Sequence, residues 1–186
     1  MRRVLAAVLV VLVLTGCGAE DANMRRAIDL REKLLKSKEC TFEAVITADY
    51  GDQLYTFTVN CSTDTDGGLS FTVAQPRSIA GITGKLDGSG GKLTFDDKAL
   101  AFDTLADGMI TPVSAPWVFI HTLRSGYLSA CGADGENLKI IFDDSYKNEA
   151  LQLDIWLNSL DLPIRTEILW NGRRVLSMDV NNFKYL

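Results

Sequence analysis

The sequence predicts a mainly β (α+β) fold with about eleven antiparallel strands, an N-terminal helix and an apolar helix in the middle of the chain. Two observations lead to the strands. Apolar and polar residues alternate over most of the chain, as in strands that bury one face. Glycine-containing turn signals separate the alternating runs, as in hairpins. Two stretches, 21–37 and 114–125, break this alternation and predict the helices.

An export signal is expected at the N-terminus. Two arginines precede an unbroken apolar run, 4–14, which is too short to span a bilayer because a spanning helix needs about 20 residues. The run ends in Leu-Thr-Gly-Cys at 14–17, which resembles the lipobox of bacterial lipoproteins. The resemblance implies that 1–16 are a lipoprotein signal peptide. Cys17 would then carry acyl chains such as palmitate and hold the protein on the extracytoplasmic face of the cell membrane. An ordinary signal peptide with a chance cysteine is the alternative.

Removal of the signal would leave a chain long enough for one domain, with 17 basic and 24 acidic residues. This acidic excess argues against a nucleic-acid-binding protein, which would carry a basic surface. We therefore expect no nucleic-acid partner.

A short tether, 17–23, and a helix over 21–37 are expected to follow. Apolar residues in the helix recur every three or four positions, acidic residues lie at its start and basic residues at its end. Its basic face either contacts anionic headgroups of the nearby membrane or is simply solvated. The basic residues of this face are Arg25, Arg26, Arg31 and Lys33.

The first hairpin is predicted from two alternating runs that flank a glycine turn signal. If the turn is centred on Tyr50-Gly51, Cys40 faces Cys61 on the apolar side of the hairpin. Directly opposed residues have Cβ atoms about as far apart as a disulfide requires, so this pair is the disulfide candidate. A register shift of two residues would separate the pair, and Cys131 leaves two other pairings open.

Further strands are expected wherever the alternation resumes. Each run has one apolar side, and most are bounded by Gly, Asp or Asn turn signals. After the first hairpin the expected strands are 69–73, 80–86, 93–95, 100–102, 127–131, 138–142, 151–156, 164–170 and 176–180.

The second helix is predicted over 114–125. Ser114 can cap it, and Pro116 fits the first turn, where the missing N–H costs nothing. The residues 117–120 are apolar on every side of the helix, so this helix is buried or covers an apolar surface. His121, the only histidine of the chain, lies within it and is expected to be structural.

No set of catalytic or metal-binding residues stands out in the sequence. One histidine gives no Ser-His-Asp or Cys-His arrangement, and no Cys/His cluster indicates zinc. The segment 64–68 imitates part of a calcium loop but lacks the spacing and the terminal Glu, so a hairpin turn is expected there. We expect a protein that is not an enzyme and that binds no metal and no cofactor.

Several local motifs resemble clostridial membrane-anchored members of the LolA/LolB-like lipoprotein-carrier fold family, a branch that includes spore-germination lipoproteins. The resemblance implies that 24–186 form an unclosed half-β-barrel that curves around an apolar cavity, with the second helix as a lid. The motifs are Val73-Ala74-Gln75-Pro76, Ile79-Ala80-Gly81-Ile82, Ser114-Ala115-Pro116-Trp117 and Leu162-Pro163 before Glu167-Ile168.

With this resemblance, the expected function is binding of a hydrophobic ligand, a lipid or an acyl chain, in the concave face. The alternative is a non-enzymatic platform that holds or activates an envelope or spore-cortex enzyme, for example by strand addition at a sheet edge. Alternation does not distinguish an open cavity from a filled core, so both remain open. The expected ligand-binding residues are Phe42, Ile46, Tyr55, Phe57, Phe71, Trp117, Ile120, Phe142 and Trp170.

Overall fold

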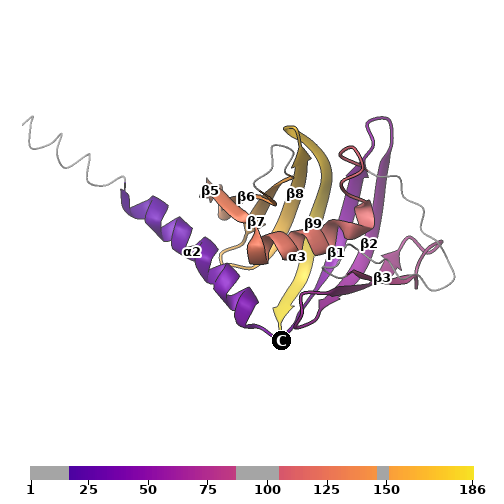
Figure 1. Ribbon diagram of the computed structural model, residues 1–186, viewed down its shortest axis with the longest axis horizontal. Helices are drawn as coiled ribbons and strands as arrows, with labels where there is room; N and C mark the ends of the chain where they lie inside the picture. Colours follow the sequence, from indigo (N-terminus) through magenta and orange to yellow (C-terminus); the bar gives the residue numbers. More distant parts are fainter. Residues whose placement is uncertain (1–16, 87–104, 146–150) are drawn as a thin grey trace, which may run out of the picture.

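The computed structural model describes residues 17–86, 105–145 and 151–186. Within these residues, nine antiparallel strands form one unclosed sheet in the order β4-β3-β2-β1-β9-β8-β7-β6-β5 (Figure 1). The predicted mainly β half-barrel with an N-terminal and a mid-chain helix is therefore confirmed. Of the eleven expected strands, 93–95 and 100–102 lie outside the described residues.

The nine strands match the alternating runs of the sequence. Burial follows the same alternation, most regularly in β1, where every second residue is buried. The strands are β1 (Cys40–Asp49), β2 (Leu54–Thr63), β3 (Leu69–Gln75), β4 (Thr83–Leu86), β5 (Tyr127–Asp134), β6 (Asn137–Asp143), β7 (Gln152–Leu157), β8 (Pro163–Trp170) and β9 (Arg173–Tyr185).

The last strand of the chain lies in the middle of the sheet. β9 pairs with β1 on one side and with β8 on the other, so it joins the meander β1–β4 to the meander β5–β8. In this part of the chain, β4 and β5 form the two edges of the sheet.

The mid-chain helix α3 (Ala115–Ser125) follows a 3-10 turn, η1 (Pro112–Ser114), and runs across the concave side of the sheet (Figure 1). The predicted helix is confirmed, with Ser114 at its N-cap and a proline in its first turn. The Ser114 hydroxyl does not cap the helix but donates to the carbonyl oxygen of Thr111 at 2.8 Å.

The register of the first hairpin differs from the prediction by two residues. Phe42, not Cys40, lies opposite Cys61, because the connection between β1 and β2 has four residues instead of two. Cys40 instead lies beside Thr63, whose hydroxyl oxygen accepts from the Cys40 N–H at 2.9 Å and lies 3.3 Å from its sulfur. The predicted disulfide is therefore wrong in this structure: the Cys40 and Cys61 thiols are both buried and are not joined. Burial raises the pKa of the Cys61 thiol.

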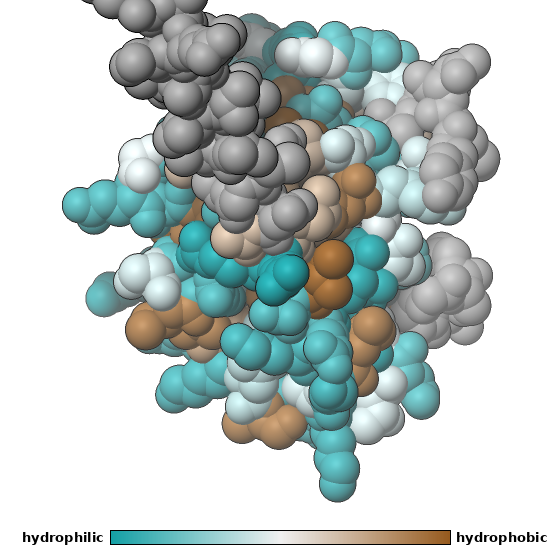
Figure 2. Space-filling model, turned by 90° about the vertical axis from the view of Figure 1, so that its left-hand side faces the viewer, coloured by the Kyte–Doolittle hydropathy of each residue, from teal (hydrophilic) through white to brown (hydrophobic). Residues whose placement is uncertain are grey.

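The N-terminal helix α2 spans Cys17–Lys36. It begins four residues before the expected start, so 17–23 form helical turns rather than an extended tether. Two of the arginines expected on its solvated face are engaged within the molecule: Arg26 pairs with Asp161 at 2.7 Å, and Arg31 is turned towards α3. Seen from the side of α2, hydrophobic groups form scattered patches between hydrophilic ones (Figure 2).

The convex face of the sheet is polar. Glu167 on β8 accepts hydrogen bonds from Arg165 at 2.6 Å and from Arg174 at 2.9 Å. Burial raises the pKa of the Glu167 carboxyl, but these hydrogen bonds outweigh it, so the pKa lies below its ordinary value. Trp156 lies on the same face, with the Lys139 ammonium 4.9 Å from its ring centroid.

Candidate functional site

Six of the nine expected ligand-binding side chains come together on the concave face, and all six are buried. The ring of Phe119, a fully buried residue of α3, meets Phe42 edge to face with centroids 5.8 Å apart. In this conformation the side chains of α3 and of the sheet pack against one another as one core. The role of the six as ligand contacts stays a prediction. They are Phe42, Ile46, Phe57, Phe71, Ile120 and Phe142.

An arginine fastens α3 at its C-terminal end. The Nε of Arg31 donates to the carbonyl oxygen of Leu123 at 2.8 Å, and its Nη2 donates to that of Gly126 at 2.6 Å. The guanidinium also lies 5.2 Å from the centroid of the Phe142 ring. The last carbonyl groups of a helix have no partner within the helix, so Arg31 satisfies them and ties α3 to α2.

Trp117, the seventh expected residue, is half-buried on α3. Its ring stacks on His121 with centroids 4.8 Å apart. His121 is exposed to solvent, and its Nε2 lies 3.3 Å from the hydroxyl of Ser125. This arrangement gives His121 a packing role on the outer side of the helix.

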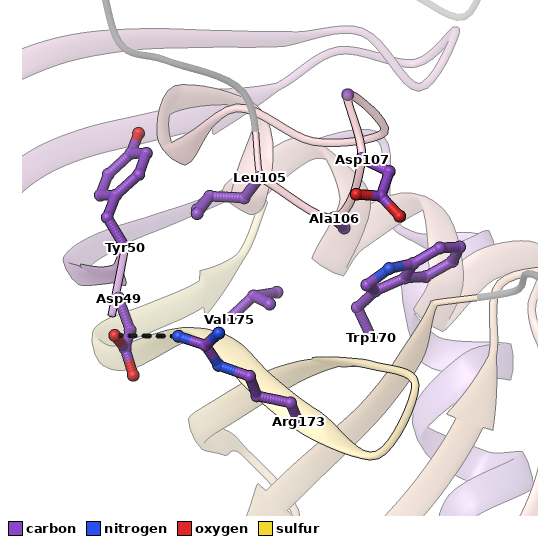
Figure 3. A pocket seen from close by; sticks show the side chains of 9 residues that line it. Asp49, Tyr50, Leu105, Ala106, Asp107, Trp170, Arg173 and Val175 are labelled. Atoms are coloured by element: carbon purple, nitrogen blue, oxygen red, sulfur yellow. Dashed lines mark ion pairs between the residues drawn. The ribbon is translucent and has the colours of Figure 1, made fainter. Parts of the chain in front are cut away.

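A pocket of about 500 Å³ lies where the β1–β2 and β8–β9 hairpins turn (Figure 3). This volume falls within the range of about 300–1,000 Å³ that small-molecule sites occupy. The apolar lining residues Leu105, Ala106 and Val175 also belong to the buried core, so the pocket reaches from solvent to the core. We call it the rim pocket; it is lined by Asp49, Tyr50, Leu105, Ala106, Asp107, Gly108, Trp170, Arg173 and Val175.

Exposed apolar side chains flank the rim pocket. Tyr55, another expected ligand residue, is 46% exposed, and its ring meets the pocket residue Tyr50 with centroids 5.6 Å apart. Leu54 and Met109, the chain neighbours of Tyr55 and of the lining residue Gly108, are 69% and 45% exposed.

The charged groups of the rim pocket lie on two sides of it (Figure 3). On one side, Arg173 approaches Asp49 with Nη2 and Oδ1 3.5 Å apart, the longest ion pair among the described residues. That same Asp49 oxygen accepts the N–H of Gly51 at 2.8 Å, which holds the hairpin turn. On the other side, the Asp107 carboxylate points towards the Trp170 ring. One guanidinium against two carboxylates leaves the pocket with net negative charge.

A tight turn builds one wall of the rim pocket. Leu105 and Ile110 form an antiparallel bridge, with the Leu105 N–H donating to the Ile110 carbonyl at 2.8 Å. Ala106 and Asp107 between them both have φ of 52°, in the left-handed region. Left-handed backbone costs a non-glycine residue about 1 kcal/mol or more, so the turn presents Asp107 to the pocket at a local cost.

Of the expected site residues, only Trp170 lines the rim pocket, and the sequence did not indicate the others. Two signals were present: Tyr50-Gly51 and Asn171-Gly172 both predict turns. Because β1 and β9 pair antiparallel, these two turns lie at the same end of the sheet. Local alternation contains no information on that pairing, since the two strands lie at opposite ends of the sequence.

The described residues contain no group of three or more His, Cys, Asp or Glu that could hold a metal ion. The segment 64–68 forms the expected hairpin turn, in which the Asp64 carboxylate accepts the N–H of Gly68 at 2.7 Å. None of the described helices is long and apolar enough to cross a membrane.

No protein-family model matches the chain, and no curated protein matches it either. Solved structures do. A conserved protein from Thermus thermophilus is similar over 88% of this chain and 87% of its own, with 11% identity and a TM-score of 0.44. A LolA superfamily protein from Nitrosomonas europaea is similar over 86% and 93%, with 10% identity and a TM-score of 0.39. Lipoprotein LppX from Mycobacterium tuberculosis is similar over 86% and 91%, with 9% identity and a TM-score of 0.39. The expected LolA-like resemblance thus has counterparts among solved structures, while the clostridial branch stays a prediction.

Proposed function

We propose that this protein is a non-catalytic, membrane-anchored extracytoplasmic lipoprotein that binds a lipid or another acyl-chain amphiphile at the rim pocket. The observation that carries this proposal is the continuity of the pocket from solvent to the core. Its lining residues Leu105 and Val175 belong to the buried core, and the exposed ring of Tyr55 contacts the lining residue Tyr50.

The apolar end of the rim pocket suits the methylene groups of an acyl chain. Each buried methylene contributes about 0.8 kcal/mol, so about six of them contribute about 5 kcal/mol before the cost of ordering the ligand. A longer chain would reach the concave face beneath α3, whose buried side chains pack against those of the sheet. The rim pocket therefore binds the part of the ligand next to its headgroup. The position of α3 sets how far the acyl chain of the ligand enters beneath it.

The anchor is part of the proposal and rests on the lipobox-like residues before Cys17. A protein with acyl chains on its N-terminal cysteine sediments with membranes and gains the mass of these chains. Intact-mass spectrometry of the membrane fraction tests this, with Cys17→Ser as the variant expected in the soluble fraction.

Ligand binding is tested by titration of the purified protein with N-phenyl-1-naphthylamine, a neutral apolar dye whose fluorescence rises in apolar sites. We expect saturable binding in the micromolar range. Trp170→Ala removes an aromatic wall of the rim pocket and weakens binding about tenfold. Trp156→Ala removes the same side chain from the convex face and leaves binding within about twofold, since that face lies outside the pocket.

Two results would overturn the proposal. One is the absence of saturable binding by the wild-type protein, freed of co-purifying lipid. The other is an equal effect of the two tryptophan substitutions, which would place the dye elsewhere or reveal a general loss of structure.

The second candidate function is a platform for a protein partner, and the edge strand β5 favours it. Among the described strands β5 pairs only with β6, and its eight residues are at least partly exposed on both faces. Such an edge accepts an added strand. Crosslinking in intact cells followed by pull-down should recover one envelope protein, and Ala130→Lys on β5 should abolish its recovery. Equal recovery with the variant would contradict strand addition at this edge.

A further inference from the structure

We propose that the rim pocket selects amphiphiles with a zwitterionic headgroup, in which a phosphate binds Arg173 and an ammonium binds between Trp170 and Asp107. This inference rests on the proposed function, because it specifies which headgroup the same pocket takes.

Arg173 is placed to bind a phosphate. Its side chain is 61% exposed and its only ion pair is the long contact with Asp49. The short ion pairs of the chain are different: Arg26 with Asp161 and Arg174 with Glu167 lie at 2.7 and 2.9 Å. The Asp49 oxygen that faces Arg173 also accepts the N–H of Gly51 at 2.8 Å, so the guanidinium shares this acceptor. The remaining N–H groups of Arg173 offer the paired donors that phosphate oxygens accept.

Trp170 and Asp107 provide the complementary site for a cation. Figure 3 shows the Asp107 carboxylate directed towards the indole of Trp170, away from Arg173. An ammonium beside an indole ring is attracted by the ring electrons, and a nearby carboxylate adds a charge of opposite sign. The described structure contains no ion pair to Asp107, so its charge is available to a ligand.

The charge balance of the pocket separates headgroup classes. Asp49 and Asp107 together exceed Arg173 by one negative charge, which disfavours a purely anionic headgroup. An uncharged headgroup can make only hydrogen bonds to these three side chains and gains no charge pairing from them. A headgroup with a phosphate and an ammonium meets a charge of opposite sign for each: Arg173 for the phosphate, and Asp107 for the ammonium.

The test is displacement of the neutral dye by three lysolipids with the same short acyl chain, each kept below its micelle concentration. Their headgroups are phosphocholine, phosphoglycerol and uncharged glycerol. We expect the phosphocholine lipid to displace the dye at about one-tenth of the concentration that either of the others needs.

Three variants locate the selectivity. Arg173→Gln should weaken binding of the phosphocholine lipid about tenfold and leave binding of the glycerol lipid unchanged. Asp107→Asn should weaken the phosphocholine lipid and strengthen the phosphoglycerol lipid, because it removes the excess negative charge. Arg174→Gln is the matched control, since Arg174 neighbours Arg173 but pairs with Glu167 on the convex face; it should change none of the three.

Equal displacement by all three lipids would overturn the headgroup inference while leaving the proposed function intact, because the dye would still bind. If Arg174→Gln weakened binding of the phosphocholine lipid as much as Arg173→Gln does, the headgroup inference would also be overturned. Failure of the dye itself to bind would instead refute the proposed function.

Discussion

Substitution of Arg31 by methionine should loosen α3 from the rest of the molecule. Methionine keeps an unbranched apolar stem, so the change removes the hydrogen bonds and the charge but little of the packing. The carbonyl groups of Leu123 and Gly126, at 2.8 and 2.6 Å from Arg31, would lose their partner. The carbonyl of Thr122, at 3.4 Å, contributes less.

The magnitude follows from the two short hydrogen bonds. A hydrogen bond from a charged donor is worth about 1.5 kcal/mol or more, so the two give about 3 kcal/mol of unfolding free energy. For a domain of this length, 1 kcal/mol lowers Tm by about 2–4 °C, and the expected drop is therefore about 6–12 °C.

Thermal unfolding followed by circular dichroism measures this drop. Arg25→Met is the matched control, because Arg25 lies on the exposed side of the same helix. We expect its Tm to stay within about 2 °C of the wild type. A Tm of Arg31→Met equal to that of the control would refute the assignment of Arg31 as the residue that fastens α3.

Three further predictions concern the core and the convex face. Gly84→Ala should lower the unfolding free energy by about 1–3 kcal/mol in urea titrations, because its Cβ would lie 2.5 Å from the buried ring of Phe71; an unchanged urea midpoint would show that the ring moves aside. Because the folded pKa of Glu167 is depressed, its carboxylate stabilises the protein above its ordinary pKa of 4.5 and this stability is lost as the pH falls through the lower folded value. The Glu167→Gln variant should therefore have a lower free energy of unfolding than the wild type at pH 7. The difference in free energy should shrink as the pH falls through the folded pKa of Glu167, and a difference that does not depend on pH would contradict this reasoning. Native alkylation with iodoacetamide, read by mass spectrometry, should modify the half-buried Cys131 well before the buried Cys61, whose pKa is raised; equal rates would contradict the burial.

Local patterns in the sequence predicted most elements of the fold, because each strand and helix has a periodicity that its own residues set. The hairpin register was wrong for a specific reason. The Asp49 carboxylate accepts the N–H of Gly51, and four residues connect β1 to β2. The alternation of apolar and polar residues alone does not distinguish this connection from a two-residue turn. That difference of two residues moved Cys40 away from Cys61.

The ligand contacts expected from the sequence stay a prediction. Aromatic residues such as Phe42 and Phe142 lie on the inner face, where alternation placed them, and pack in the core. The rim pocket, which local patterns did not indicate, collects side chains from both ends of the chain, such as Asp49 and Arg173. Their proximity depends on the pairing of β1 with β9, which no short-range pattern encodes.

The central position of β9 also sets the order of events during synthesis. Glu43 and Asn181, neighbours across the β1–β9 ladder, are 138 residues apart, so the sheet is completed only when the last residues are available. Until then, both β1 and β8 present an unpaired edge to any other chain nearby, and such edges favour aggregation. Contacts of this long range also make folding slow. The two meanders β1–β4 and β5–β8 therefore become one sheet only after β9 has been synthesised.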